Sequence, residues 1–153
     1  MDFGGRYKLS APRRDVWEAL NDTAVLKATI PGCQRIEWTS ENTLELHIKV
    51  NLGVVHPVFT GDLALTNVLP AHSYTLSGKG RGGILGLAEG AADITLSDSG
   101  EGCELAFSAR GGASGQIMRL GKSLIGNSAQ KVIDGFFERF AEAMGTTIEP
   151  IAD

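Results

Sequence analysis

The sequence predicts an α+β fold in which one antiparallel sheet packs its apolar face against a long helix near the C-terminus. Two observations predict this fold class. Between residues 43 and 111, successive segments alternate apolar and polar side chains, which is typical of half-buried β-strands. From Gln116 to about Met144 the apolar residues recur every three or four positions, which is typical of an amphipathic helix.

The N-terminal elements are short. Alternation predicts a first strand from Phe3 to Leu9. A serine and a proline at positions 10 and 12 predict a helix start, because a hydroxyl can cap free N–H groups and proline suits the first turn. Val16, Trp17 and Leu20 form the apolar face of this helix. A second short helix is expected from about Thr23 to Ala28, where a proline–glycine pair soon ends it.

The strands that follow are separated by turn-like breaks. The stretch TLELHIKVNLG at 43–53 places aliphatic side chains on one face and charged or amide side chains on the other. The same alternation gives four further inward faces: Phe59, Gly61, Leu63 and Leu65; Tyr74, Leu76, Gly78 and Gly80; Ala88, Gly90, Ala92, Ile94 and Leu96; Cys103, Leu105, Phe107, Ala109 and Gly111. Five or six consecutive strands of this kind predict an antiparallel meander.

Side-chain volume falls along these inward faces. Each strand carries large inward side chains toward one end and small ones toward the other. The small residues are Gly61, Gly78, Gly80, Ala88, Gly90, Ala92, Ala109 and Gly111. Either helix and sheet pack closely here, or glycine bulges bend the sheet, or the space holds a ligand. We favour a ligand-sized cavity, because sheet and helix carry small residues on the surfaces that face each other.

The C-terminal helix also carries small residues on the stripe that is expected to face the sheet. Gly121 and Ser128 lie on its apolar stripe with Ile117, Leu124 and Ile125, where a core helix would carry large side chains. Glycines at 121, 126 and 135 are expected in the helix interior, where each costs about 1 kcal/mol relative to alanine. A Gly121→Leu substitution is therefore expected to fill the cavity.

Two glycine-rich motifs resemble nucleotide-binding loops but lack the required context. Gly78, Gly80 and Gly83 satisfy GxGxxG, yet residues 84–96 return to strand alternation instead of opening a helix. Residues 115–123 end in Gly-Lys-Ser, but the spacing between their two glycines is one residue too long for a Walker A loop. The histidines share no metal-ligand spacing and no serine adjoins a base, so no catalytic or metal-binding residue is predicted.

Length, charge and cysteine usage narrow the class of protein. The 153 residues suit one domain, expected over 1–146, followed by a short tail over 147–153. A net charge of −4 argues against a nucleic-acid partner. No apolar run reaches the ~18–20 residues that span a bilayer. Cys33 and Cys103 form no CxxC motif and the N-terminus resembles no signal peptide, so we expect a reduced, cytoplasmic protein.

Several ordered motifs together resemble one family. These are IPGCQRIE, FTGDL, GKGRGGILGLAEGAADITL, LGKSLIG and FFERF, which occur in this order between residues 30 and 140. In this respect the chain resembles the carbon monoxide dehydrogenase CoxG family of the START-like helix-grip (SRPBCC) superfamily. The resemblance extends over about residues 1 to 145.

The resemblance implies a fold and a role. The fold is a helix grip, in which about seven antiparallel strands wrap around a long C-terminal helix, with two short helices after strand 1. The role is that of an accessory protein to molybdenum-containing CO dehydrogenase-type hydroxylases, in membrane association and in binding a quinone or similar molecule. Some relatives end in an apolar tail, whereas this chain ends in TTIEPIAD. We therefore expect at most a peripheral, transient contact with the inner membrane surface.

We expect a non-catalytic binding or carrier protein for a quinone or lipid-like molecule, with no required cofactor and with CO dehydrogenase-type hydroxylase subunits as candidate partners. The alternatives are a polyketide cyclase/dehydratase-like enzyme and a ligand-free assembly module. Ser128, Tyr74 and Asn127 are candidates to orient a polar head group. The cavity is expected to be lined by Trp17, Leu26, Ile30, Leu46, Ile48, Phe59, Gly61, Leu63, Tyr74, Leu76, Gly78, Gly90, Ala92, Phe107, Ala109, Leu120, Gly121, Leu124 and Ser128.

Overall fold

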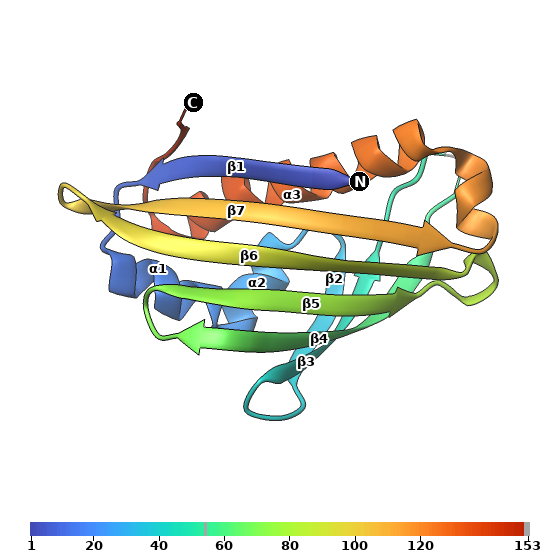
Figure 1. Cartoon of the computed structure of the whole chain (residues 1–153), viewed down its shortest axis with the longest axis horizontal. Helices are drawn as coiled ribbons and strands as arrows, with labels where there is room; N and C mark the ends of the chain where they lie inside the picture. The colour runs from blue at the N-terminus through green and yellow to red at the C-terminus, as the bar shows by residue number, and fades with distance from the viewer. Residues whose placement is uncertain (54, 152–153) are drawn as a thin grey trace.

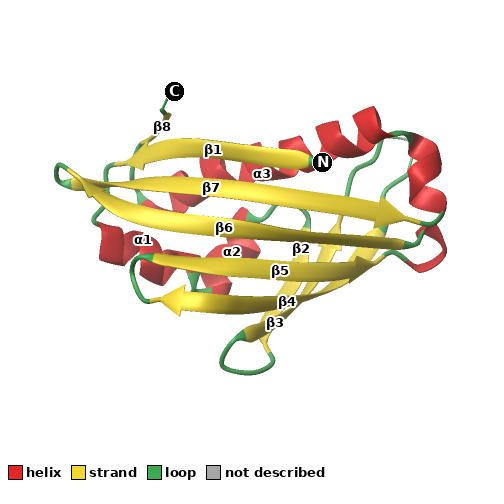
Figure 2. Cartoon of the chain, viewed as in Figure 1, coloured by secondary structure: helices red, strands yellow, loops and turns green. Residues whose placement is uncertain are grey.

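A computed structural model describes residues 1–53 and 55–151 of the chain. One curved antiparallel sheet covers a long helix and two short ones (Figures 1 and 2). The elements are β1 (Asp2–Leu9), α1 (Arg13–Leu20), α2 (Thr23–Thr29), β2 (Cys33–Trp38), β3 (Thr43–Lys49), β4 (Val58–Leu69), β5 (Ser73–Arg81), the 3₁₀ turn η1 (Gly83–Leu85), β6 (Leu87–Ser99), β7 (Gly102–Ser114), the 3₁₀ turn η2 (Gln116–Leu120), α3 (Lys122–Met144) and β8 (Ile148–Pro150). The predicted α+β class and helix-grip arrangement are confirmed.

The sheet has eight strands in the order β2-β3-β4-β5-β6-β7-β1-β8. Strand β2, which the alternation pattern alone did not predict, pairs with β3 at one edge. At the other edge, β8 pairs with Tyr7–Leu9 of β1. The segment expected to be a tail therefore extends the sheet through Pro150, while residues 152–153 lie outside the described residues. None of the helices in the described part of the chain is long and apolar enough to cross a membrane.

The single helix expected from residue 116 is wrong, because two separate elements occupy this stretch. Gly115 and Gly121 flank η2 with φ angles of 90° and 89°, a backbone region that side chains other than glycine rarely adopt. The chain therefore turns at Gly121, and α3 begins only at Lys122. Gly121 is not in a helix interior, so the predicted helical cost at this residue does not apply.

The sheet register aligns the inward residues of neighbouring strands. Leu63 pairs with Gly78, which pairs with Gly90, which pairs with Gly111, so β4 to β7 contribute one continuous row. A neighbouring row runs from Leu46 through Gly61 and Gly80 to Ala88 and Ala113. The small residues of separate strands thus form one patch on the inner face, as the alternation pattern predicted.

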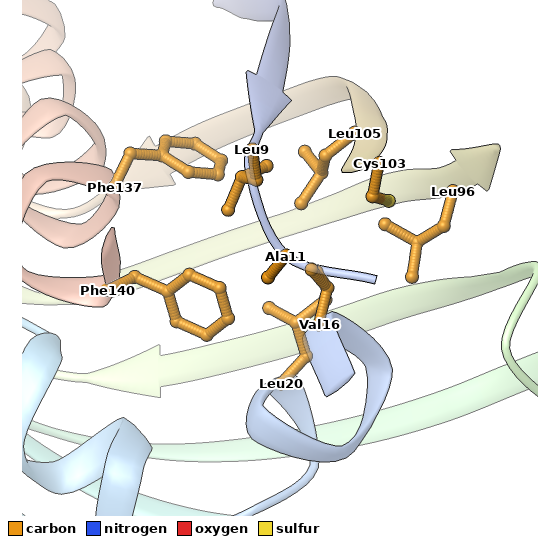
Figure 3. Close-up of a cluster of buried hydrophobic side chains, with 9 residues drawn as sticks. All are labelled: Leu9, Ala11, Val16, Leu20, Leu96, Cys103, Leu105, Phe137 and Phe140. Carbon is orange, nitrogen blue, oxygen red and sulfur yellow. The ribbon is translucent and has the colours of Figure 1, made fainter. Parts of the chain in front are cut away.

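Apolar clusters close both ends of the sheet. The largest lies where α1 and the C-terminal half of α3 meet β1, β6 and β7, and contains Leu9, Ala11, Val16, Leu20, Leu96, Cys103, Leu105, Phe137 and Phe140 (Figure 3). A second cluster packs α2 against the sheet around Leu26 and Tyr74. At the opposite end of the strands, Leu52, Phe59 and Ile117 form a third cluster. These clusters leave the small-residue patch between them.

Candidate ligand-binding cavity

A cavity of about 450 Å³ lies between the inner face of the sheet and α3. This volume falls within the range of about 300–1,000 Å³ that is typical of small-molecule pockets. The sheet side consists of Leu46, Ile48, Val50, Leu52, Phe59, Gly61, Leu63, Leu76, Gly78, Gly80, Ala88, Gly90, Ala92 and Ala109. The helical side consists of Ile117, Ile125, Ser128, Ala129, Val132 and Ile133. The walls are therefore almost entirely apolar.

The inward glycines do not serve close packing of α3 on the sheet. A Cβ atom placed on Gly61, Gly90 or Gly111 would meet only atoms of neighbouring strands within 4 Å, and none of α3. Nor are the glycines bulges, because the register irregularities lie between Cys33 and Arg35 in β2 and between Thr66 and Leu69 in β4. Of the three explanations that the sequence left open, the cavity is the one that fits.

On the helix, small side chains border the cavity at Ser128 and Ala129. Two of the glycines that were expected in the helix lie elsewhere than at the cavity wall. A Cβ atom on Gly135 would lie 2.9 Å from Cγ of Pro31, so this glycine lets the end of α2 approach α3 closely. Gly121 is not among the described residues that line this cavity, and no described atom lies within 4 Å of an added Cβ, so the expectation that Gly121→Leu fills the cavity is wrong.

The structure brings many of the predicted cavity residues together and places others elsewhere. Those at the cavity wall are Leu46, Ile48, Phe59, Gly61, Leu63, Leu76, Gly78, Gly90, Ala92, Ala109 and Ser128. Trp17, Leu26, Ile30 and Tyr74 belong instead to the cluster beside α2, and Phe107 packs against the cluster beside α1. Leu120 packs against the cluster around Ile117, and Leu124 is half-buried outside the wall.

Sequence reasoning did not select some residues of the wall. Val50, Gly80 and Ala88 share the inward parity of their strands, and Ile117, Ile125 and Val132 share the helical stripe, so a signal for them was present. Leu52 shares the inward parity of residues 43–53, and Ile133 follows Ile125 by eight residues on the helical stripe, so only Ala129 had no such signal. Leu52 follows β3 in a loop, and its buried position depends on how that loop folds against Phe59 and Ile117.

The three candidates for orienting a head group lie in different surroundings. Asn127 is exposed. Tyr74 is buried against the edge of Trp17, with ring centroids 5.4 Å apart, and this burial raises the pKa of its phenol to about 12. Ser128 is buried and borders the cavity. Only Ser128 of these three stands at the wall.

Charged side chains near the cavity point away from it. Lys79, Glu89 and Arg110 border the space but occupy outward positions of their strands and are exposed. They also border an open hollow of about 720 Å³ on the outer face, directly behind the glycine row. The wall between the two spaces is therefore one backbone thick, with an ionic surface outside and an apolar surface inside.

The histidines also lie away from the cavity wall. His47 bonds to Glu45 at 3.0 Å on the outer face, as expected, and His72 contacts Arg13 at 3.0 Å. His56 is exposed in the loop before β4. Among the described residues, the cavity can thus bury apolar surface and offer one hydroxyl, but no titratable side chain points into it.

Comparison with solved structures shows where this fold recurs. A conserved protein from Geobacillus kaustophilus is similar over 97% of this chain and 99% of its own, with 21% identity and a TM-score of 0.85. The Zhui aromatase/cyclase from Streptomyces sp. R1128 is similar over 95% and 93%, with 13% identity and a TM-score of 0.64. Ara h 8.0201 is similar over 94% and 97%, with 13% identity and a TM-score of 0.65. These likenesses concern the fold.

Sequence comparison identifies the family. No match was found among curated proteins. A family model that describes the CoxG subunit of carbon monoxide dehydrogenase matches residues 5–145, which include every element from α1 to α3 and all of the cavity wall. The chain belongs to the CoxG family of carbon monoxide dehydrogenase subunits.

Proposed function

We propose that this protein binds an apolar small molecule, a quinone or isoprenoid-like lipid, in the cavity between the sheet and α3. The observation that carries the proposal is the apolar space of about 450 Å³ behind the glycine rows. Burying about 300 Å² of ligand apolar surface there is worth about 7 kcal/mol, from which several kcal/mol of association cost are subtracted. The resulting moderate affinity suits a carrier that must release its ligand.

The proposed role is that of a non-catalytic accessory protein to a molybdenum-containing CO dehydrogenase-type hydroxylase. Membership of the CoxG family supports the partner. The chemistry of the cavity wall supports a binding role, because general acid–base catalysis needs a titratable group within reach of the substrate. The proposed compartment is the cytoplasm, which agrees with two free cysteines, Cys33 and Cys103.

Mass spectrometry of organic extracts of the protein, purified from its native host, tests the ligand. We expect an apolar molecule in stoichiometric amount, and a rise in melting temperature when menadione is added to the extracted protein. A protein without any extractable ligand that also fails to respond to menadione would contradict the proposal. If a hydroxylase subunit copurified with such a protein, the ligand-free assembly module would be favoured instead.

We further propose that one end of the molecule contacts an anionic membrane surface. The apolar-cationic end consists of three segments, which are the described residues of 50–58 (all but residue 54), 81–88 and 112–122, and they meet around Leu52, Phe59 and Ile117. Ile84 at its tip is 85% exposed, and Val55, Val58, Leu87 and Met118 are exposed as well. These three segments contain no Asp or Glu but carry Arg81, Arg119 and Lys122. Exposed apolar side chains beside cations are typical of surfaces that bind anionic lipid.

A lipid surface fits this end better than a protein partner does. Ile84 protrudes from a loop that contains several glycines, and bilayer insertion requires no complementary pocket for it. Arg81 pairs with Asp62 at 3.1 Å, whereas no ion pair is present for Arg119 or Lys122 among the described residues. The same end adjoins the cavity through Val50, Leu52 and Ile117, which gives an apolar ligand a short route to the bilayer.

Sedimentation with phosphatidylglycerol-containing vesicles tests this contact. We expect Ile84→Asp to weaken vesicle binding about tenfold. The variant loses an apolar side chain that would insert into the lipid, and its new carboxylate is repelled by the anionic head groups. Leu69→Asp is the matched control, since Leu69 is 60% exposed at the far end of β4. Equal loss in both variants, or no binding of the wild type, would contradict the proposal and favour a protein partner.

A further inference from the structure

Ser128 is the one polar side chain that faces the cavity among the described residues of its wall. Ile125, Ala129, Val132 and Ile133 surround it on α3, and glycine, alanine and aliphatic side chains lie opposite. The serine is only 8% exposed. A hydroxyl in such a position is costly unless it has a hydrogen-bond partner, so its presence points to a specific use.

No described residue supplies a partner for this hydroxyl. A serine inside a helix commonly donates to the carbonyl four residues earlier, which here belongs to Leu124. No hydrogen bond of the Ser128 hydroxyl is formed with any described residue. No fully buried side-chain oxygen of the described chain lacks a partner, so the Ser128 oxygen must be accessible. The space that makes it accessible is the cavity.

The surroundings also restrict the charge of the ligand. Lys79, Glu89 and Arg110 are kept outside by strand parity, and Arg110 contacts Asp93 there at 3.4 Å. No charged side chain of the described wall is thus placed to pair with a carboxylate or an ammonium group inside. Because burying an unpaired charge is far more costly than burying a neutral oxygen, a charged ligand would be rejected.

We propose that Ser128 determines the ligand class of this cavity, which is an uncharged apolar molecule with one hydrogen-bond-accepting oxygen placed against the Ser128 hydroxyl. This inference rests on the proposed function and makes it more specific. A carbonyl is the group that fits best, because it accepts the hydroxyl proton and brings no donor of its own that the apolar wall would leave unpaired. Fatty acids in their ionised form are excluded from the class.

Three naphthalene probes of matched shape test the inference: 2-ethylnaphthalene, 2-acetylnaphthalene and 2-naphthoate. Dissociation constants are measured for the wild type, for Ser128→Ala and for the control Ser123→Ala, which lies exposed in the first turn of α3. The affinity ratio of acetyl to ethyl probe cancels differences in probe hydration. We expect this ratio to fall about three- to tenfold in Ser128→Ala and to stay unchanged in Ser123→Ala.

In the wild type, 2-naphthoate is expected to bind at least about tenfold more weakly than 2-acetylnaphthalene at neutral pH. An unchanged acetyl-to-ethyl ratio in Ser128→Ala overturns the inference, and so does tight binding of 2-naphthoate. In both cases binding of 2-ethylnaphthalene leaves the proposed function intact. If the folded wild type, checked by circular dichroism, binds none of the probes, the proposed function fails together with the inference.

Discussion

Tyr74 carries a phenol hydroxyl into the apolar cluster beside α2, and its hydroxyl bonds to no described residue. Burial disfavours the phenolate and raises the pKa of Tyr74 to about 12, from an ordinary value of 10.0. The folded state therefore holds the proton more tightly than the unfolded state between these values. The stability linked to this proton is complete below pH 10 and is lost as the pH rises toward 12.

The Tyr74→Phe variant isolates this effect. The wild type is expected to lose about 2 to 3 kcal/mol of unfolding free energy between pH 10 and 12 through Tyr74 alone, and the variant should lack that component. Near neutral pH the two proteins should be almost equally stable, because no hydrogen bond is removed. Urea unfolding across this pH series measures the difference. Parallel pH profiles for the two proteins would show that Tyr74 is not buried as described.

At the level of single residues, the sequence could predict the face of the sheet to which a side chain points, but not the distance between the sheet and α3 at that residue. Strand parity placed Gly61, Gly78 and Gly90 on the inner face correctly, since a pleated strand leaves no other choice. Strand parity could not show along which part of the sheet α3 packs directly against the inner face. For this reason Tyr74 and Phe107, which share the inward parity, lie in packed clusters rather than at the cavity.

Among the elements, α3 shows two different uses of glycine. Gly126 has only the flexible sulfur of Met1 near the position of an added Cβ, at 3.4 Å. At Gly135 an added Cβ would lie 2.9 Å from the ring of Pro31. The first glycine is thus replaceable, whereas the second sets the distance between α3 and the end of α2.

Alanine substitutions distinguish these uses. Gly126→Ala is expected to stabilise the protein by up to about 1 kcal/mol, the difference in helix propensity. Gly135→Ala gains the same propensity, but the clash with Pro31 should cancel or exceed it. Equilibrium urea unfolding of both variants gives the comparison. A clear gain of stability in Gly135→Ala would show that Pro31 and α3 are not in close contact.

Sequence reasoning found long elements better than short ones. The strands from β3 to β7 were visible because their alternation persists over many residues. Strand β2 has one buried side chain, Ile36, and so little pattern to detect. The break at Gly121 was missed because residues 117 and 120 keep the helical spacing even though the backbone turns between η2 and α3.

For the whole molecule, the cavity is a consequence of where the bulky residues gather. Large side chains fill both ends of the sheet, around Phe140 at one end and Phe59 at the other. Between these ends, the glycine rows of the sheet and the small residues of α3 leave a cavity that is large enough for a ligand. The sequence predicted this distribution of volume, whereas the exact cavity boundary depended on how the loop after β3 and the turn η2 close one end.

A pair of valine substitutions tests this distribution of volume most directly. Gly61 faces the cavity and Gly112 faces the outer hollow, both in extended strands, and neither has an atom closer than 3.5 Å to an added Cβ. Titration with 2-ethylnaphthalene is expected to show binding at least about tenfold weaker in Gly61→Val and unchanged in Gly112→Val, with both variants melting no lower than the wild type. Undiminished binding by Gly61→Val, or unfolding of that variant alone, would contradict a ligand cavity between the sheet and α3.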